Sequence, residues 1–305
     1  MAKPRSTPAR RPDPRRYESL THTKLTRPEA VAQAAAGRRR HPGLGSGQIL
    51  LIAADHPARG ALGVGGDELA MADRRDLLDR LRLALARPGV DGLLGSPDLV
   101  DDLLLSGDLE GKLLFGTINR AGLQGASFEF DDRATAYTPR ALQTLGADGG
   151  KMLTRIALDD PATARTLQWA AKTVTRLAGL GLYAMVEPFW SRWEAGKVVH
   201  DLSWAAVNRS MQVASSLGAT SARTILKVPV VPDMERVMAA TTLPTVLLGG
   251  DPTAAPAEVY ASWRAALALP GVIGLTVGRT LLYPPDGDVA GAVDTAAGLL
   301  RRAGP

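Results

Sequence analysis

The chain repeats one pattern: a short apolar run is followed in most cases by a longer amphipathic stretch. Eight such runs of four to six residues lie at 49–54, 90–94, 112–117, 149–154, 182–187, 224–228, 245–248 and 272–277. Runs that are apolar on both faces are typical of parallel strands covered by helices. Eight repeats of strand and helix therefore predict an α/β protein, a (β/α)8 TIM barrel.

A doubly wound open sheet would fit the same alternation. The amphipathic stretches lie at 73–86, 161–178, 203–217, 233–240 and 256–269, each closed by Gly or Pro. The open sheet's dinucleotide-binding fingerprint is missing. Residues 63–66, Gly-Val-Gly-Gly, follow a strand but lack the required glycine spacing and a helix directly behind them. We interpret them as a flexible loop and favour the barrel.

Charge divides the chain at about residue 46. Residues 1–40 hold 11 Lys or Arg against 3 acidic residues, a net charge of +8, so residues 41–305 carry 5 − 8 = −3. We expect a basic Pro/Arg-rich extension over 1–46 and a barrel over 47–305. Residues 1–16 are predicted to be unstructured. A short helix is predicted over 27–36, with Thr26 as N-cap, Pro28 in its first turn and Gly37 just past its end.

The basic extension has two interpretations. It can bind nucleic acid, or it can be a solvated segment that bridges subunits of a homo-oligomer. Tyr17 is its single aromatic residue, and no nucleic-acid-binding module is recognisable. We therefore favour a homo-oligomer that binds no nucleic acid.

Composition excludes several kinds of chemistry. With no cysteine, the chain has no disulfide, thiolate metal site or cysteine nucleophile. Of four histidines, His22 and His41 precede the barrel, so a multi-histidine zinc site in the barrel is not expected. No apolar run is long enough to span a bilayer. We expect a cytoplasmic protein without a metal, a cofactor or a membrane contact.

Polar residues follow the strands, where barrels collect their active groups. In strand order they are Asp55 with His56 and Arg59; Asn119 with Arg120; Lys151 and Arg155; Glu187; Lys227; Gly249, Gly250 and Asp251; and Gly278, Arg279 and Thr280. Each alone has a structural explanation, such as a turn glycine or an ion pair. Together they bring an amine, two carboxylates and an anion-binding loop to one mouth, the set that Schiff-base carbon–carbon chemistry on a sugar phosphate requires.

Lys227 lies inside the apolar run Thr-Ile-Leu-Lys-Val-Pro-Val, residues 224–230. A lysine in a buried strand either pairs with a carboxylate at the strand end or is desolvated there. Desolvation lowers the pKa of the amine and makes it nucleophilic.

The motifs resemble those of class I aldolases, the superfamily of fructose-bisphosphate, tagatose-bisphosphate and deoxyribose-phosphate aldolases. The resemblance covers about residues 47–303. Its motifs are Ala-Asp-His-Pro-Ala-Arg-Gly at 54–60, Leu-Lys-Val-Pro at 226–229, Leu-Gly-Gly at 248–250 and Val-Gly-Arg at 277–279.

The resemblance implies a role for each residue. Lys227 would form the imine, Asp55 would handle substrate hydroxyls, and Glu187 would be the acid/base partner. Lys151 would help to depress the pKa of Lys227. Gly249, Gly250, Gly278 and Arg279 would bind the phosphate.

The substrate is expected to be a phosphorylated keto sugar or keto sugar acid. The resemblance extends to aldolases of inositol breakdown, which would cleave 2-deoxy-5-keto-gluconate 6-phosphate to dihydroxyacetone phosphate and malonate semialdehyde. Arg59 and Arg155 are candidates for binding a substrate carboxylate, although arginines serve phosphates equally well. The alternatives are a thiolase-like or transaldolase-like relative and a non-catalytic sugar-phosphate-binding barrel.

Overall fold

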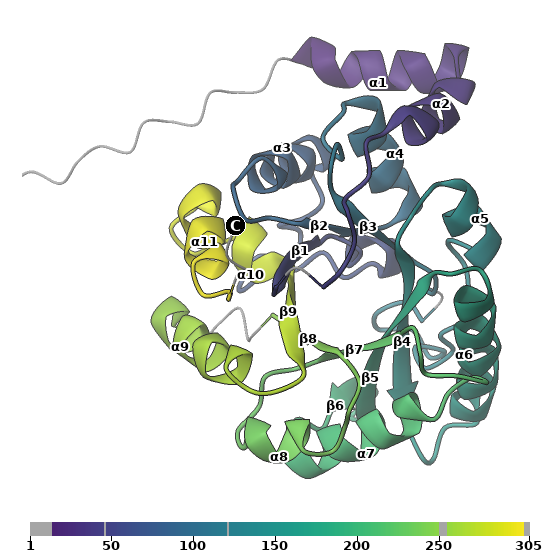
Figure 1. Ribbon diagram of the computed structural model, residues 1–305, viewed down its shortest axis with the longest axis vertical. Coiled ribbons are helices and arrows are strands. Elements are labelled where there is room, and N and C mark those ends of the chain that lie inside the picture. Colours follow the sequence, from purple (N-terminus) through teal and green to yellow (C-terminus); the bar gives the residue numbers. More distant parts are fainter. Residues whose placement is uncertain (1–13, 46, 121, 250–254, 302–305) are drawn as a thin grey trace, which may run out of the picture.

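Eight parallel strands pair in a closed ring with helices around it (Figure 1). The computed structural model describes residues 14–45, 47–120, 122–249 and 255–301. The strands are β1 Ile49–Ala53, β2 Gly92–Gly95, β3 Leu113–Thr117, β4 Gly149–Ile156, β5 Tyr183–Glu194, β6 Lys197–His200, β7 Thr224–Val228, β8 Thr245–Leu248 and β9 Val272–Val277. The ring runs β1-β2-β3-β4-β5-β7-β8-β9 and returns to β1.

This ring confirms the predicted (β/α)8 barrel. Each of the eight apolar runs overlaps a barrel strand, and β7 coincides with the predicted run at 224–228. Pairing of β4 with β5 joins the two halves of the sheet, which an open doubly wound sheet does not do.

Helices follow the barrel strands and cover the ring. They are α3 Arg74–Leu85, α4 Pro97–Leu105, α5 Pro139–Thr144, α6 Ala162–Gly179, α7 Trp204–Ser215, α8 Met234–Met238, α9 Pro256–Leu267, α10 Arg279–Leu282 and α11 Val289–Ala297. The five predicted amphipathic stretches each overlap one of these helices. Within the described part of the chain, no helix has the length and apolar character to cross a bilayer.

The N-terminal extension differs from its prediction. A helix that the sequence pattern did not predict, α1 Pro14–Thr26, precedes α2 Glu29–Gly37. Residues 14–16 are therefore helical, and residues 1–13 lie outside the described residues. Thr26 is not the N-cap of α2: it ends α1 and donates its hydroxyl to the carbonyl of His22 at 2.8 Å, while Pro28 occupies the cap position.

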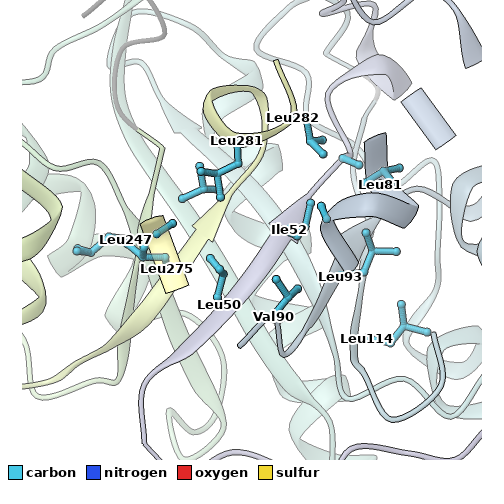
Figure 2. Packing of buried hydrophobic residues seen from close by; sticks show 14 of the residues in the cluster. Leu50, Ile52, Leu81, Val90, Leu93, Leu114, Leu247, Leu275, Leu281 and Leu282 are labelled. Carbon is cyan, nitrogen blue, oxygen red and sulfur yellow. The ribbon is translucent and has the colours of Figure 1, made fainter. Parts of the chain in front are cut away.

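Alternation along each strand separates two cores. Leu50 and Ile52 of β1 face the helices and join the large outer core shown in Figure 2. Ile49, Leu51 and Ala53 face the barrel interior and pack with other inward residues. Because successive side chains point to opposite faces, every second residue continues towards the same interior. The inward position after Ala53 is Asp55, at the mouth of the barrel.

β5 is longer than the other barrel strands and leaves the ring as a hairpin. Residues 191–194 pair antiparallel with β6, so Ser191 lies opposite His200. Ala195 and Gly196 both have positive φ, 48° and 74°, which suits the tight turn between the two strands. This hairpin, residues 191–200, was not predicted, and it brings His200 back to the barrel mouth.

Candidate active site

Strand register brings Lys227 and Glu187 together. Met185 of β5 lies opposite Ile225 of β7, and both belong to the inner core. Two residues further on, Glu187 and Lys227 occupy the same inward positions. The Lys227 Nζ donates to Glu187 Oε1 at 2.7 Å, and both side chains are buried. The register therefore produces a buried ion pair at the carboxyl ends of the strands.

Lys151 and Asp55 extend this pair into a chain of alternating charges. The Lys151 Nζ donates to Asp55 Oδ2 at 3.2 Å and also contacts the second carboxylate oxygen of Glu187. Arg120, directly after β3, forms an ion pair with Asp55. Across the barrel, the order is Arg120, Asp55, Lys151, Glu187, Lys227. The sequence pattern predicts that Arg120 follows a strand, but it does not predict that Asp55 is its partner.

Burial and charge act on Lys227 in opposite directions. Burial lowers its pKa, the charge and hydrogen bond of Glu187 raise it, and the cations Arg120 and Arg279 lower it further, so the pKa lies below its ordinary value. Lys151 was expected to supply the cationic effect. Its own pKa is held well below the usual range by burial and by Arg120, and it contacts Glu187 instead. Arg120 and Arg279 are the cations that lower the pKa of Lys227, and Lys227 in turn lowers the pKa of Lys151, so the two amines are coupled.

Glu187 remains a carboxylate in this setting. Burial alone would raise its pKa, but the charges and hydrogen bonds of Lys151 and Lys227 hold the pKa well below its usual range. Asp55 is 1% exposed, and it is not among the described residues that line either of the two cavities described next. Asp55 therefore lies outside both cavities and contacts two residues of the larger one, Lys151 and Arg120.

Two cavities meet at the barrel mouth. The smaller one, of about 60 Å³, is lined by Lys227, Gly249, Gly278 and Thr280 among others. The larger one, of about 180 Å³, is lined by Arg59, Arg120, Lys151, Leu153, Phe189 and His200. His56, Glu187, Leu248 and Arg279 line both. One elongated molecule can therefore reach Lys227 in the smaller cavity and the basic residues of the larger one.

The loops after β8 and β9 surround Lys227 closely. A Cβ on Gly278 would lie 2.2 Å from the carbonyl oxygen of Ala53, so only glycine fits there. Gly249 is also tightly placed, 3.2 Å from Val277 Cγ1 by the same construction. The Arg279 Nη1 donates to the carbonyl of Gly63 at 3.2 Å and lines both cavities. Gly250 and Asp251 lie outside the described residues.

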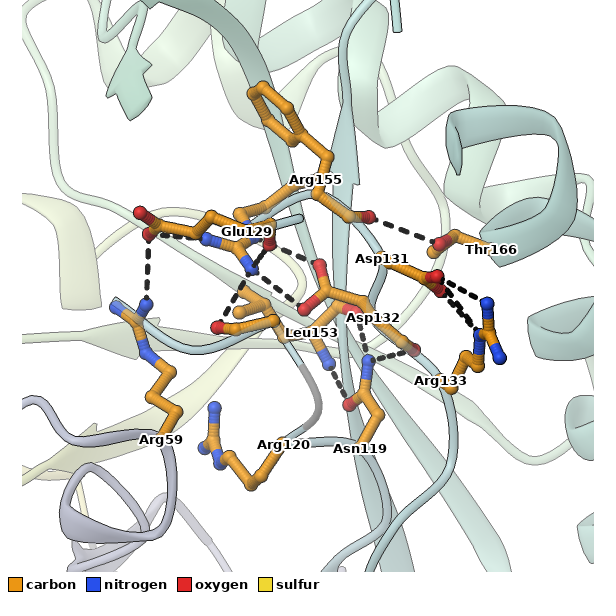
Figure 3. A network of polar contacts seen from close by, with 12 residues as sticks. Arg59, Asn119, Arg120, Glu129, Asp131, Asp132, Arg133, Leu153, Arg155 and Thr166 are labelled. Carbon is orange, nitrogen blue, oxygen red and sulfur yellow. Dashed lines mark hydrogen bonds and ion pairs between the residues drawn. The ribbon is translucent and has the colours of Figure 1, made fainter. Parts of the chain in front are cut away.

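Arg155 does not reach the site. Its side chain is 0% exposed and is held by Asp132 at 2.9 and 2.8 Å and by Glu129 at 2.9 Å (Figure 3). A substrate carboxylate cannot reach a guanidinium enclosed in this way, so the expectation for Arg155 is wrong. Its partners lie in the segment after β3, residues 118–138, which Arg155 fixes onto β4.

Arg59 does line the larger cavity. Its Nη1 is 3.4 Å from Glu129 Oε1, the atom that also accepts from Arg155 at 2.9 Å. The Arg59 side chain keeps 17% of its surface exposed, whereas Arg155 has none. Of the two arginines considered for an anionic group, Arg59 alone has access.

Two histidines at the site had no predicted role. Burial, with Arg279 and Lys227, holds the pKa of His56 well below its ordinary value. Burial, with Arg155 and Arg59, lowers the pKa of His200 to about 4. Both rings are therefore neutral at pH 7. Across the residues whose placement is described, no group of three or more His, Asp or Glu side chains forms a candidate metal site.

Comparisons with known proteins agree with the barrel. A family model described as Cgl0159-like matches residues 47–297. The crystal structure of Cgl0159 from Corynebacterium glutamicum is 52% identical, with a TM-score of 0.92, and the match covers 94% of this chain and 97% of that one. The comparison with curated proteins gave no match.

Aldolase structures share the fold at lower identity. A Schiff-base-forming fructose-1,6-bisphosphate aldolase is 19% identical, with a TM-score of 0.62, over 84% of this chain and 95% of that one. An archaeal fructose-1,6-bisphosphate aldolase, with its catalytic lysine bound to the carbinolamine intermediate, is 17% identical, with a TM-score of 0.63, over 88% and 98%. At these identities the likeness shows a common barrel.

Proposed function

The chain belongs to the Cgl0159-like family, and on that premise we propose that it is a class I aldolase in which Lys227 forms an imine with a phosphorylated keto sugar or keto sugar acid. One observation carries the proposal. A buried lysine of lowered pKa is hydrogen-bonded to a buried carboxylate in a cavity at the carboxyl ends of the barrel strands. Such a lysine is equipped for nucleophilic attack on a carbonyl.

The mechanism uses the neutral amine of Lys227. It attacks the ketone carbon to give a carbinolamine, and loss of water leaves a protonated imine. A proton leaves the hydroxyl on the carbon that becomes the aldehyde, and the adjacent carbon–carbon bond breaks. The bonding electrons move to the imine nitrogen and form an enamine, which is protonated on carbon and hydrolysed to release the ketone product and free Lys227.

Glu187 is the proton carrier in this proposal. It lines both cavities and contacts Lys227 and Lys151, so it reaches the carbinolamine oxygen and the substrate hydroxyl. The resemblance to aldolases implied that Asp55 would take the hydroxyl proton. Because Asp55 is enclosed by Arg120 and Lys151, we assign it instead the task of holding those two cations in position.

The smaller cavity supports a substrate whose phosphate is close to its ketone. Gly249, Gly278 and Arg279 surround the cavity that contains Lys227, so an anionic group there lies near the imine carbon. A dihydroxyacetone phosphate unit has this spacing, with one carbon between ketone and phosphate. We propose 2-deoxy-5-keto-gluconate 6-phosphate as the substrate, cleaved to dihydroxyacetone phosphate and malonate semialdehyde, a step of inositol catabolism.

Borohydride trapping tests the proposal. With dihydroxyacetone phosphate and borohydride, we expect the protein to gain the mass of the reduced adduct on the peptide that contains Lys227. Lys227→Arg keeps the positive charge and removes the reactive amine, so both trapping and turnover are expected to be lost. Lys172→Arg, an exposed lysine of α6, is the matched control and is expected to react as the wild type does.

Three outcomes separate the alternatives. Adduct on Lys227 together with cleavage of the keto acid phosphate supports the full proposal. Adduct without cleavage of that compound leaves the imine chemistry and rejects the substrate. Phosphate-dependent binding without any adduct contradicts the aldolase and favours a non-catalytic sugar-phosphate-binding barrel.

A further inference from the structure

The larger cavity holds more positive charge than the imine chemistry uses. Among the described residues that line it, Arg59, Arg120, Lys151 and Arg279 are basic and Glu187 is acidic. Asp55 is not among the residues that line the cavity, and it pairs with two that do, Arg120 and Lys151. Buried charges are normally paired, so a surplus of cations in a cavity indicates an anionic ligand.

The excess positive charge lies at two residues, Arg279 and Arg59. The charges of Arg120 and Lys151 are paired with those of Asp55 and Glu187. Arg279 lies where the two cavities meet and serves the phosphate in the proposed function. That leaves Arg59, which lines the larger cavity but not the smaller one.

Arg59 is weakly neutralised by its own neighbours. Both carboxylate oxygens of its partner Glu129 accept shorter hydrogen bonds from other groups. Oε1 accepts from Arg155 at 2.9 Å, and Oε2 accepts from the backbone N–H of Gly125 at 2.8 Å. The contact from Arg59 to Glu129, at 3.4 Å, is the longest of the three. The guanidinium is therefore positioned by Glu129 and retains the capacity to bind a second anion.

His200 reaches the same cavity from the hairpin. Its ring stacks on Phe189, with centroids 4.3 Å apart and planes at 21°, and its Nδ1 lies 2.8 Å from Ser191 Oγ. Trp193 also fixes the hairpin, by donating to Asp160 Oδ2 at 2.8 Å and by packing edge-on against Phe130. The ring is therefore held in one orientation by the hairpin itself.

The neutral ring of His200 has one N–H, and its position depends on the tautomer. Ser191 Oγ is 2.8 Å from His200 Nδ1 and 3.4 Å from the carbonyl of Phe189. In the tautomer in which Nδ1 accepts from Ser191, the imidazole carries its proton on Nε2. The proposal below uses this tautomer, in which His200 offers a donor in the cavity that Arg59 also lines.

We propose that Arg59 and His200 form a second anion subsite, which binds an acidic group on the part of the substrate that leaves as the aldehyde. The inference rests on the proposed function, because Lys227 and the phosphate occupy the smaller cavity. It makes the substrate an anion at both ends. The second acidic group is a carboxylate or a second phosphate, since both accept from an arginine and an imidazole N–H.

The condensation direction tests the subsite directly. Wild-type protein is supplied with dihydroxyacetone phosphate and one of three aldehydes: malonate semialdehyde, with a carboxylate; glyceraldehyde 3-phosphate, with a phosphate; and neutral glyceraldehyde. We expect kcat/KM for at least one anionic aldehyde to exceed that for glyceraldehyde by about tenfold or more, the value of one charge-assisted hydrogen bond. The better of the two anionic aldehydes identifies the acidic group.

Matched variants assign the preference to the two residues. Arg59→Met and His200→Asn are expected to raise KM for the anionic aldehyde about tenfold with little change for glyceraldehyde. Asparagine retains a partner for Ser191 but lacks an atom at the Nε2 position, whereas His200→Gln places an amide there and is expected to recover part of the affinity. His22→Asn, on the exposed face of α1, is the control.

The experiment separates failure of the subsite from failure of the proposed function. Absence of a borohydride adduct with dihydroxyacetone phosphate in the wild type overturns the aldolase and the subsite with it. An adduct together with equal kcat/KM for all three aldehydes overturns the subsite alone. The subsite is also overturned if Arg59→Met and His200→Asn form the adduct and keep the wild-type preference.

Discussion

Burial and three charged side chains determine the pKa of Lys227. Burial favours the neutral amine, Glu187 favours the ammonium, and the positive charges of Arg120 and Arg279 again favour the neutral form. The net result is a lysine that is hydrogen-bonded and positioned, yet closer to its reactive state than an exposed lysine. In the proposed aldolase mechanism, the carboxylate beside Lys227 costs some reactivity, and it supplies the proton carrier that imine formation requires.

Two substitutions should move the reactivity of Lys227 in opposite directions. Glu187→Gln removes the charge that raises the pKa of Lys227, so the amine becomes neutral at lower pH. Arg279→Met removes a cation that lowers this pKa, so the amine becomes neutral at higher pH. The measurement is the pH dependence of reductive methylation of Lys227 without substrate, read by peptide mass. Exposed Lys172 in the same digest is the internal reference, and shifts of equal sign would contradict the assignment.

Among the elements that carry the site, the barrel strands were predicted and the β5–β6 hairpin was not. Short apolar runs bounded by Gly and Pro determine barrel strands locally, and the alternation of faces then assigns Lys151, Glu187 and Lys227 to the interior. The β5–β6 hairpin was not predicted because β6 has only four residues and none of them is buried. The only local indication of the hairpin was the turn at Ala195 and Gly196. Arg155 was misjudged for a different reason. Its partners Glu129 and Asp132 come from a segment whose course the sequence pattern does not determine.

Arg155 should matter for stability rather than for binding. Arg155→Met leaves Glu129 and Asp132 as buried carboxylates without their principal cation, which is expected to lower the free energy of unfolding by about 3–5 kcal/mol. Urea denaturation measures the change. Arg192→Met, which removes an exposed pair with Glu194, is the control and is expected to cost about 0–1 kcal/mol. A loss as small as that of the control would show that the segment after β3 does not depend on Arg155.

Gly278, directly after β9, packs closely against Ala53 at the end of β1. In Gly278→Ala the new Cβ would meet the carbonyl of Ala53, so the end of β1 and the following Asp55 and His56 must shift. We expect a loss of about 1–3 kcal/mol in unfolding free energy, as for overpacked sites, together with a large fall in kcat/KM. Gly298→Ala is the matched control, because its Cβ would meet neighbours at 3.4 Å and its φ of −67° is helical. Activity near the wild-type value in Gly278→Ala would contradict the close packing.

For the whole molecule, the barrel and the short helix α2 were predictable, and the helix α1 was not. Eight strand runs in one order specify a closed ring almost without reference to side-chain detail. The helix α1 has a polar sequence, and its position depends on contacts with the barrel helices. Tyr17 donates to the carbonyl of Arg75 and contacts the carboxylate of Asp79, and Lys24 pairs with Asp102 at 2.7 Å. The division at about residue 46, the cytoplasmic location and assembly into a homo-oligomer stay predictions.

Truncation tests what the extension does. The described residues that line the two cavities are all numbered 53 and above, so a variant without residues 1–16 is expected to keep kcat and its melting temperature. A variant without residues 1–27 loses Tyr17 and Lys24, so we expect a lower melting temperature with kcat retained at 25 °C. Light scattering of both variants measures whether the extension bridges subunits. Duplex DNA or RNA binding that weakens with salt and disappears on removing residues 1–16 would favour the nucleic-acid alternative, because six of the extension's basic residues lie there.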